Sequence, residues 1–143
     1  HTDSTAAMTK AEERGVFAFG QASDMGKFGP RAQLTTIIDD WAPYYVDRVG
    51  AALNGTWESK DTWDGLAPGM AAIGNFSNDI PANILAEALA LESAIGSGRR
   101  HSFTGPINKQ DGSEWLAQGQ RADDGTLLGM NFYVEGIEGE VPQ

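Results

Sequence analysis

The sequence predicts an α/β fold in which a mainly parallel sheet is flanked by helices. Segments with helical spacing of apolar residues alternate along the chain with short apolar or β-branched segments, and this alternation is typical of layered α/β proteins. A length of 143 residues suits one domain with a proper core. No apolar run approaches the ~20 residues of a membrane-spanning helix.

Composition and charge exclude several classes of function. The chain has 20 acidic and 10 Lys or Arg residues, a formal net charge of -10 and a sequence pI near 4.4. Nucleic acids and anionic membrane surfaces carry negative charge, so this balance argues against both as partners. The chain has no cysteine, which excludes disulfides, thiolate nucleophiles and zinc sites built from cysteine.

The first 53 residues are expected to form a helix, two strands and a second helix, in that order. Helix formers follow Ser4 and Thr5, which are candidate N-caps, and end at Gly15. Pro43 suits only a first helical turn, so the second helix should begin near Asp40. The expected elements are a helix over Ala6–Arg14, a buried strand over 16–20, a strand over 32–38 and a helix over 40–53.

The rest of the chain is expected to hold a short strand, a long helix, a hairpin and a last strand. Asp79 and Pro81 mark the start of the helix, and Asp111-Gly112 marks the hairpin turn. The pair Asp123-Asp124 is expected to cap a short helical turn. The expected ranges are a strand over 70–73, a helix over 81–95, hairpin arms over 103–107 and 115–116, and a strand over 130–134.

Known catalytic patterns are missing from the sequence. It has two histidines, His1 and His101. His1, Asp3 and Ser4 are near neighbours at a chain end, where a base cannot be held against a nucleophile. There is no Gly-x-Ser-x-Gly elbow, Walker loop or His-Glu-x-x-His motif. We therefore expect a protein that is not an enzyme, with no cofactor and no metal.

Acidic residues follow two of the expected strands. Asp24 lies just after the first, and Asp39 and Trp41 lie after the second. Ligands of open α/β sheets bind outside the carboxyl ends of the strands, so Asp24 can accept hydrogen bonds from sugar hydroxyls or a ring N–H. The alternative for Asp24 is an Asx turn that shapes the loop. Trp41 can stack on a flat ring or pack into the core. Thr2 and Asp3 join the same edge if a strand precedes His1.

Four segments together resemble a known family. They cover residues 15–25, 34–45, 103–107 and 130–136, and they include Gly20-Gln21-Ala22-Ser23-Asp24 and Gly105-Pro106. In this order they resemble the C-terminal half of the basic membrane protein family. These are basic membrane lipoproteins, the solute-binding proteins of ABC importers, of the purine-nucleoside receptor type.

The resemblance implies a type I periplasmic binding protein, in which two α/β lobes close on a ligand. Residues 1–143 would form most of the C-terminal lobe, with the N-terminal lobe, signal peptide and lipid-bearing cysteine upstream. The expected role is to carry a purine nucleoside or nucleobase to ABC permease subunits in the periplasm, or lipid-anchored at the outer face of the cytoplasmic membrane. Because an isolated lobe exposes its cleft, it is also expected to form homodimers.

The resemblance also assigns site residues. Asp24 matches an aspartate that binds the ribose in nucleoside receptors. Asp39 falls where these receptors carry a lysine that contacts the base. An acceptor there suits an exocyclic amino group or ring N–H, which favours adenine or adenosine. The family's stacking aromatic aligns near Ala6 or Ala7, so Trp41 or the other lobe would replace it. The alternatives are an α/β hydrolase acting on nucleosides and a ligand-sensing regulatory module.

Overall fold

The computed structural model describes residues 4–142, which divide into two compact units between Ser97 and Gly98. The first unit is a mixed α/β structure with a three-stranded sheet, and the second contains a small antiparallel pair of strands. Among the described residues, no helix is both long and apolar enough to cross a bilayer.

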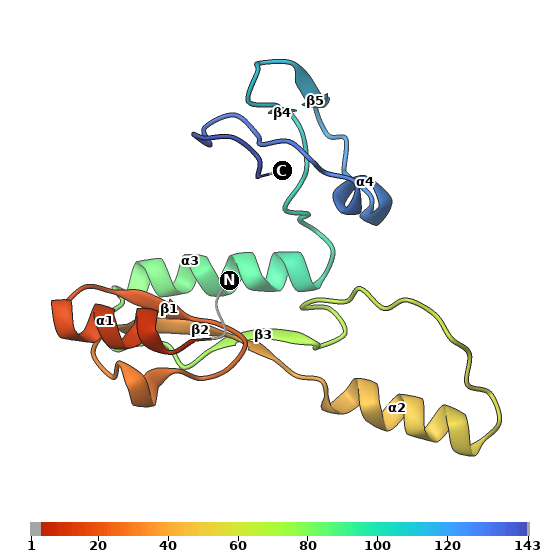
Figure 1. Ribbon diagram of the computed structural model, residues 1–143, viewed down its shortest axis with the longest axis horizontal. Helices are drawn as coiled ribbons and strands as arrows, with labels where there is room; N and C mark the ends of the chain where they lie inside the picture. Colours follow the sequence, from red (N-terminus) through yellow and green to blue (C-terminus); the bar gives the residue numbers. More distant parts are fainter. Residues whose placement is uncertain (1–3, 143) are drawn as a thin grey trace. The chain divides into compact units, whose positions relative to one another are not determined.

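The sheet of the first unit has the order β1-β2-β3 (Figure 1). Its strands are β1 (Ala18–Gly20), β2 (Gln33–Asp39) and β3 (Ala71–Gly74). β1 and β2 are parallel, as expected. β3 is antiparallel to β2, so the expectation of a mainly parallel sheet is wrong. The reason is the connection: after β2 the chain makes an excursion and returns to the same end of the sheet, where Asp39 pairs with Ala71.

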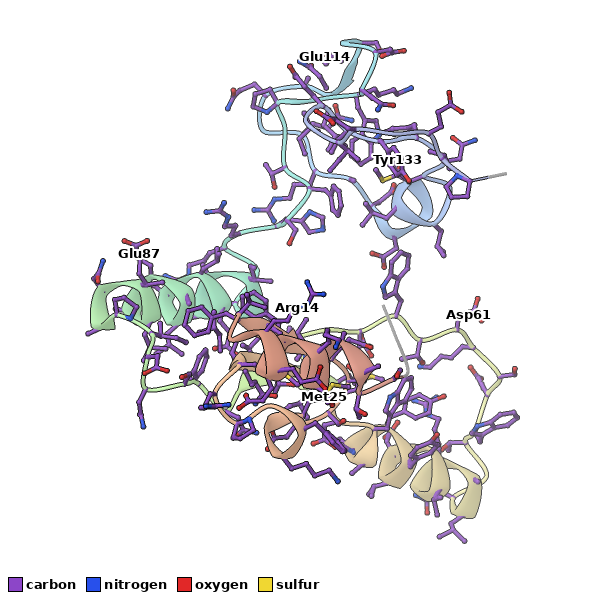
Figure 2. The ribbon with its side chains drawn as sticks, turned by 60° about the vertical axis from the view of Figure 1, so that its left-hand side comes forward. Arg14, Met25, Asp61, Glu87, Glu114 and Tyr133 are labelled. Carbon is purple, nitrogen blue, oxygen red and sulfur yellow. The ribbon has the colours of Figure 1, made fainter. Side chains whose placement is uncertain are left out.

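The core of the first unit lies between α1 (Ala6–Arg14) and the sheet. Met8, Ala11 and Ala32 form the buried cluster. Met25, labelled in Figure 2, packs against this cluster. α1 has the predicted bounds and ends at Gly15, whose φ of 64° lies in the left-handed region that favours glycine. The prediction that the strand over 16–20 is buried is wrong. β1 lies at the edge of the sheet, and Phe19 is 67% exposed.

The excursion between β2 and β3 contains α2 (Ala42–Leu53) and an irregular segment over 54–70 (Figure 1). Pro43 lies in the first turn of α2, as predicted. The apolar stripe of this helix is not packed: Val46 is 73% exposed and Leu53 is 83% exposed. Before β2, the chain also forms a short 3-10 helix, η1 (Gly26–Phe28).

The long helix α3 (Ala82–Gly96) closes the first unit and agrees with the prediction for residues 81–95. Its N-cap is Pro81, and no side chain caps its first turn, so the expected cap by Asp79 is wrong. Instead, the backbone N–H of Asp79 donates to the Ser77 hydroxyl, 3.2 Å away. This local bond turns the chain before the helix begins.

The second unit holds β4 (Ile107–Asn108), β5 (Glu114–Leu116) and α4 (Asp124–Leu128). β4 and β5 form a hairpin around the predicted turn at Asp111-Gly112, but the first arm, predicted over 103–107, is a strand only from Ile107 on. Asp123 caps α4 as predicted, accepting a 2.7 Å hydrogen bond from the N–H of Thr126. The prediction of a strand over 130–134 is wrong. Val134 forms only an isolated bridge with Lys109, beside the two-residue strand β4.

Candidate functional site

The loop over 21–25, which follows β1, turns back along β2. The carbonyl of Ala22 accepts from the N–H of Asp39 at 3.0 Å. Further along, the carbonyl of Ser23 accepts from the Thr36 hydroxyl at 2.7 Å. Asp24 then accepts from the side chain of Gln33 at 2.9 Å. The loop thus runs antiparallel to β2 and carries Asp24 from the end of that strand toward its beginning.

A glycine at the end of β1 makes this close packing sterically allowed. A Cβ atom at Gly20 would lie 2.3 Å from the hydroxyl oxygen of Thr36 and 2.8 Å from the side-chain oxygen of Gln33. Real Cβ atoms do not approach other atoms so closely, so any side chain here would displace Thr36 or Gln33. Two residues later Ala22 has a φ of 64°, which lets the chain reverse.

The Asp24 carboxylate is held in place by its neighbours. Its Oδ1 accepts from the N–H of Gly26 and from the Gln33 amide, each at 2.9 Å. The bond from Gln33 is the main cause that lowers the pKa of Asp24 below its ordinary value of 3.8, and Gly26 and the Asn75 side chain lower it further. The Asx turn considered from the sequence is therefore present. Because Asp24 is exposed, its ionised carboxylate can also accept from a ligand.

A surface hollow of about 360 Å³ lies beside Asp24. It is lined by Gly26, Gln33 and Asn75, together with residues 76–79 at the end of β3. These first three residues all contact Asp24. The carboxylate therefore stands next to a concave surface that is lined mostly by polar residues, with Pro30 and Phe76 as apolar members.

Asp39 and Trp41 lie at the carboxyl end of β2. Trp41 is 48% exposed and belongs to an aromatic cluster with Tyr44 and Tyr45, whose ring centroids are 5.7 and 6.3 Å away. This cluster lies outside the buried core, which consists of other residues. The side chain of Asp39 is exposed and has no hydrogen-bond partner within residues 4–142. Both side chains are thus accessible to a ligand.

The structure brings only part of the predicted set together. Asp39 contacts the loop through its backbone bond to Ala22, whereas Asp24 contacts Gln33 further back along the strand. Thr2 and Asp3 lie outside the described residues. Gln33 was missed by the sequence analysis, although an amide side chain in an otherwise apolar and β-branched strand is a visible signal.

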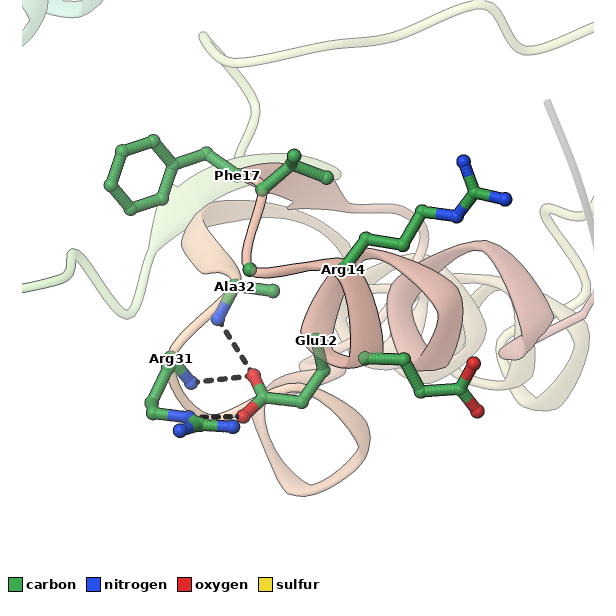
Figure 3. A pocket seen from close by; sticks show the side chains of 8 residues that line it. Glu12, Arg14, Phe17, Arg31 and Ala32 are labelled. Carbon is green, nitrogen blue, oxygen red and sulfur yellow. Dashed lines mark hydrogen bonds and ion pairs between the residues drawn. The ribbon is translucent and has the colours of Figure 1, made fainter.

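Two further hollows lie elsewhere in the first unit. One, of about 380 Å³, lies between α2 and residues 60–70 and is lined by Tyr44, Arg48 and Trp63. Figure 3 shows the other, of about 410 Å³, where Glu12 accepts hydrogen bonds from the backbone N–H groups of Arg31 and Ala32 and from the Arg31 guanidinium. These bonds tie the end of α1 to the start of β2.

The part of the chain that the structure describes holds no cluster of three or more His, Cys, Asp or Glu side chains placed to bind a metal ion. The carboxylates of Asp24 and Glu12 therefore do not belong to such a cluster. Asp24 and Glu12 accept hydrogen bonds from amide and guanidinium groups. The arrangement can recognise polar groups of a ligand.

The chain is similar in sequence to known proteins. No family model matches the chain. Over all 143 residues the chain is 54% identical to a purine-binding protein of Brucella abortus, and it spans 41% of that protein's length. Over 140 residues it is 28% identical to a Haloferax volcanii protein with the provisional name ABC transporter glucose-binding protein, spanning 33% of that length.

The fold also resembles part of a solved structure. A transcriptional activator of the comK gene from Bacillus halodurans superposes with a TM-score of 0.61 over 68% of this chain and 35% of the other, at 19% identity. At this identity the likeness concerns the fold alone. Along its whole length, then, this chain is similar to about two fifths of a protein named for binding purines.

Proposed function

We propose that this chain forms most of the C-terminal lobe of a two-lobe solute-binding protein that delivers a purine to an ABC importer. The observation that carries the proposal is the 54% identity, along the entire chain, to part of a purine-binding protein. The similarity to an ABC transporter binding protein supports the importer. We also propose the type I architecture of the basic membrane protein family, on the sequence resemblance described above.

The chemistry of the proposed site fits a flat, polar-edged ligand. A purine site needs an apolar or aromatic face and a few fixed polar partners in a closed cleft. Asp24 is an ionised acceptor for the ribose hydroxyls or a ring N–H. Asp39 is an accessible acceptor for an exocyclic amino group, which favours adenine or adenosine. Trp41 supplies an accessible ring for stacking, and the other lobe supplies the remaining contacts.

The proposed protein binds its ligand without changing it. It works in the periplasm, or lipid-anchored at the outer face of the cytoplasmic membrane, and it meets the permease subunits there. A lipid anchor upstream of the chain would be its only contact with the membrane. These parts of the proposal follow from the resemblance.

The test is to identify what the natural full-length protein carries. The purified protein is denatured, and the released small molecules are identified by mass spectrometry. The expected result is a purine base or nucleoside, and calorimetry with adenine, adenosine and inosine then ranks the affinities. Release of a different class of solute, together with no binding of any of the three compounds, would contradict the proposal.

The isolated chain provides a second test. One lobe offers only part of the contacts, so residues 1–143 alone are expected to bind these purines far more weakly than the full-length protein does. Tight binding by the isolated chain in calorimetry would show that the ligand does not need a second lobe.

A further inference from the structure

We propose that Gln33 is a positioning residue, which holds the Asp24 carboxylate in the orientation that receives the ligand. This inference rests on the proposed function. Gln33 is only 7% exposed, and both ends of its amide are occupied. Its Oε1 accepts from the N–H of Met25 at 3.1 Å, and its Nε2 donates to Oδ1 of Asp24 at 2.9 Å.

These two bonds leave the amide only one orientation. If the amide were flipped, its nitrogen would face the N–H of Met25 and its oxygen would face a carboxylate, so both bonds would be lost. A buried polar group without partners is destabilising. Gln33 therefore cannot turn, and it fixes Oδ1 of Asp24 relative to the backbone of β2.

The surroundings keep the amide in this place. Gly20 has no side chain, and a Cβ there would lie 2.8 Å from Oε1 of Gln33. Gly26 donates to the same Oδ1 that Gln33 contacts. Asp24 thus meets solvent as an ionised, oriented acceptor. A carboxylate has about four lone-pair sites, so it can bind a ligand donor as well. Fixing a binding group in advance lowers the entropy cost of binding.

A set of isosteric variants separates this role from a purely structural one. Gln33→Met removes both hydrogen bonds and keeps the length of the side chain. Gln33→Glu keeps an acceptor for Met25 but cannot donate to Asp24 when ionised. Asp24→Asn is the matched control: its amide oxygen can still accept from Gln33 and from the N–H of Gly26. The loop then keeps its hydrogen bonds, but the ligand loses its charged acceptor.

The measurements use the natural full-length protein with adenine and adenosine as probes. The dissociation constant is measured by calorimetry, the melting temperature by circular dichroism, and the pKa of Asp24 by NMR of its carboxyl carbon. Gln33→Met and Gln33→Glu are each expected to weaken binding roughly tenfold, the scale of one hydrogen bond to a charged group. Gln33→Met is also expected to raise the pKa of Asp24. Asp24→Asn is expected to keep a melting temperature close to that of the wild type and to weaken binding at least about fivefold.

Each outcome supports or overturns the inference. Wild-type affinity in Gln33→Met and Gln33→Glu would overturn it and leave the proposed function standing. Wild-type affinity in Asp24→Asn would also overturn it and leave purine binding standing, because the carboxylate that Gln33 holds would then make no contact with the ligand. A wild-type protein that binds neither probe would overturn the proposed function and the inference together.

Discussion

The loop over 21–25 and helix α2 both follow a strand of the same sheet, but they are held in different ways. The loop has no regular structure, yet Gln33 and Thr36 of β2 bind its backbone and its carboxylate. Helix α2 has a regular backbone, yet none of its residues is buried. Regular secondary structure and a fixed position are therefore separate properties in this protein.

The difference matters for the proposed site. Asp24 is oriented by the fold itself, whereas Trp41 and Asp39 are exposed side chains beside a helix with an unpacked apolar stripe. We infer that the loop supplies a preformed polar contact, and that the exposed side chains near α2 would become fixed only on binding.

Gly20→Ala is expected to destabilise the fold, because its Cβ would overlap the hydroxyl of Thr36 at 2.3 Å. Overpacking of this kind costs about 1–3 kcal/mol of unfolding free energy, measured by chemical denaturation. The matched control is Gly50→Ala in α2, where nothing lies within 4 Å of the new methyl group. Glycine inside a helix is less stable than alanine by roughly 0.5–1 kcal/mol, so the control is expected to gain stability. If both substitutions changed the unfolding free energy equally, the loop after β1 would not be packed more tightly than α2.

Trp41→Ala is expected to weaken purine binding without changing the fold. Stacking of a base on an aromatic ring contributes about 1–3 kcal/mol, so the dissociation constant should rise roughly 5- to 150-fold. The unfolding free energy should stay within about 0.5 kcal/mol, as for most surface substitutions. Trp41→Phe keeps a ring and should retain most of the affinity. If Trp41→Ala binds adenine and adenosine as tightly as the wild type does, the stacking role is wrong.

Asp24 is expected to make stability depend on pH in the acid range. Its pKa is lower in the folded protein than its ordinary value of 3.8, mainly because Gln33 donates to it. The stabilising contribution is therefore fully present above that ordinary value and is lost as the pH falls through the lower, folded-state pKa. Chemical denaturation between about pH 2 and 5 measures this effect. As the pH falls, the unfolding free energy should decrease less steeply in Asp24→Asn than in the wild type. If the unfolding free energy fell equally steeply with decreasing pH in both proteins, the hydrogen bonds to the ionised Asp24 carboxylate would not stabilise the fold.

The smallest expected effect concerns the ion pair between Arg31 and Glu12. The Arg31 side chain is 82% exposed, and exposed pairs contribute little, so Arg31→Ala should cost less than about 1 kcal/mol. Glu12→Ala should cost more than Arg31→Ala does, because the carboxylate also accepts from two backbone N–H groups (Figure 3). Chemical denaturation of both variants gives the comparison. If Arg31→Ala lost more unfolding free energy than Glu12→Ala, the ion pair would be what stabilises the contact between α1 and the start of β2. The hydrogen bonds from the two backbone N–H groups would then contribute less.

Local signals were enough to predict most of the helices and turns. Gly15 ends α1, Pro43 lies in the first turn of α2, and Asp123 caps α4, because each effect depends only on neighbouring residues. The direction of β3 and the exposure of β1 depend on where distant segments return, which residue spacing does not encode. The contact between Asp24 and Gln33 is of this second kind, since it joins a loop to the following strand.

The most direct test of the account is the affinity of the full-length protein for adenine and adenosine with and without the Asp24 carboxylate. Asp24→Asn keeps the size of the side chain and an oxygen for Gly26 and Gln33, so the loop should keep its place. The dissociation constant in calorimetry is expected to rise at least about fivefold. An unchanged dissociation constant would show that the ligand does not contact Asp24 and would contradict the proposed site.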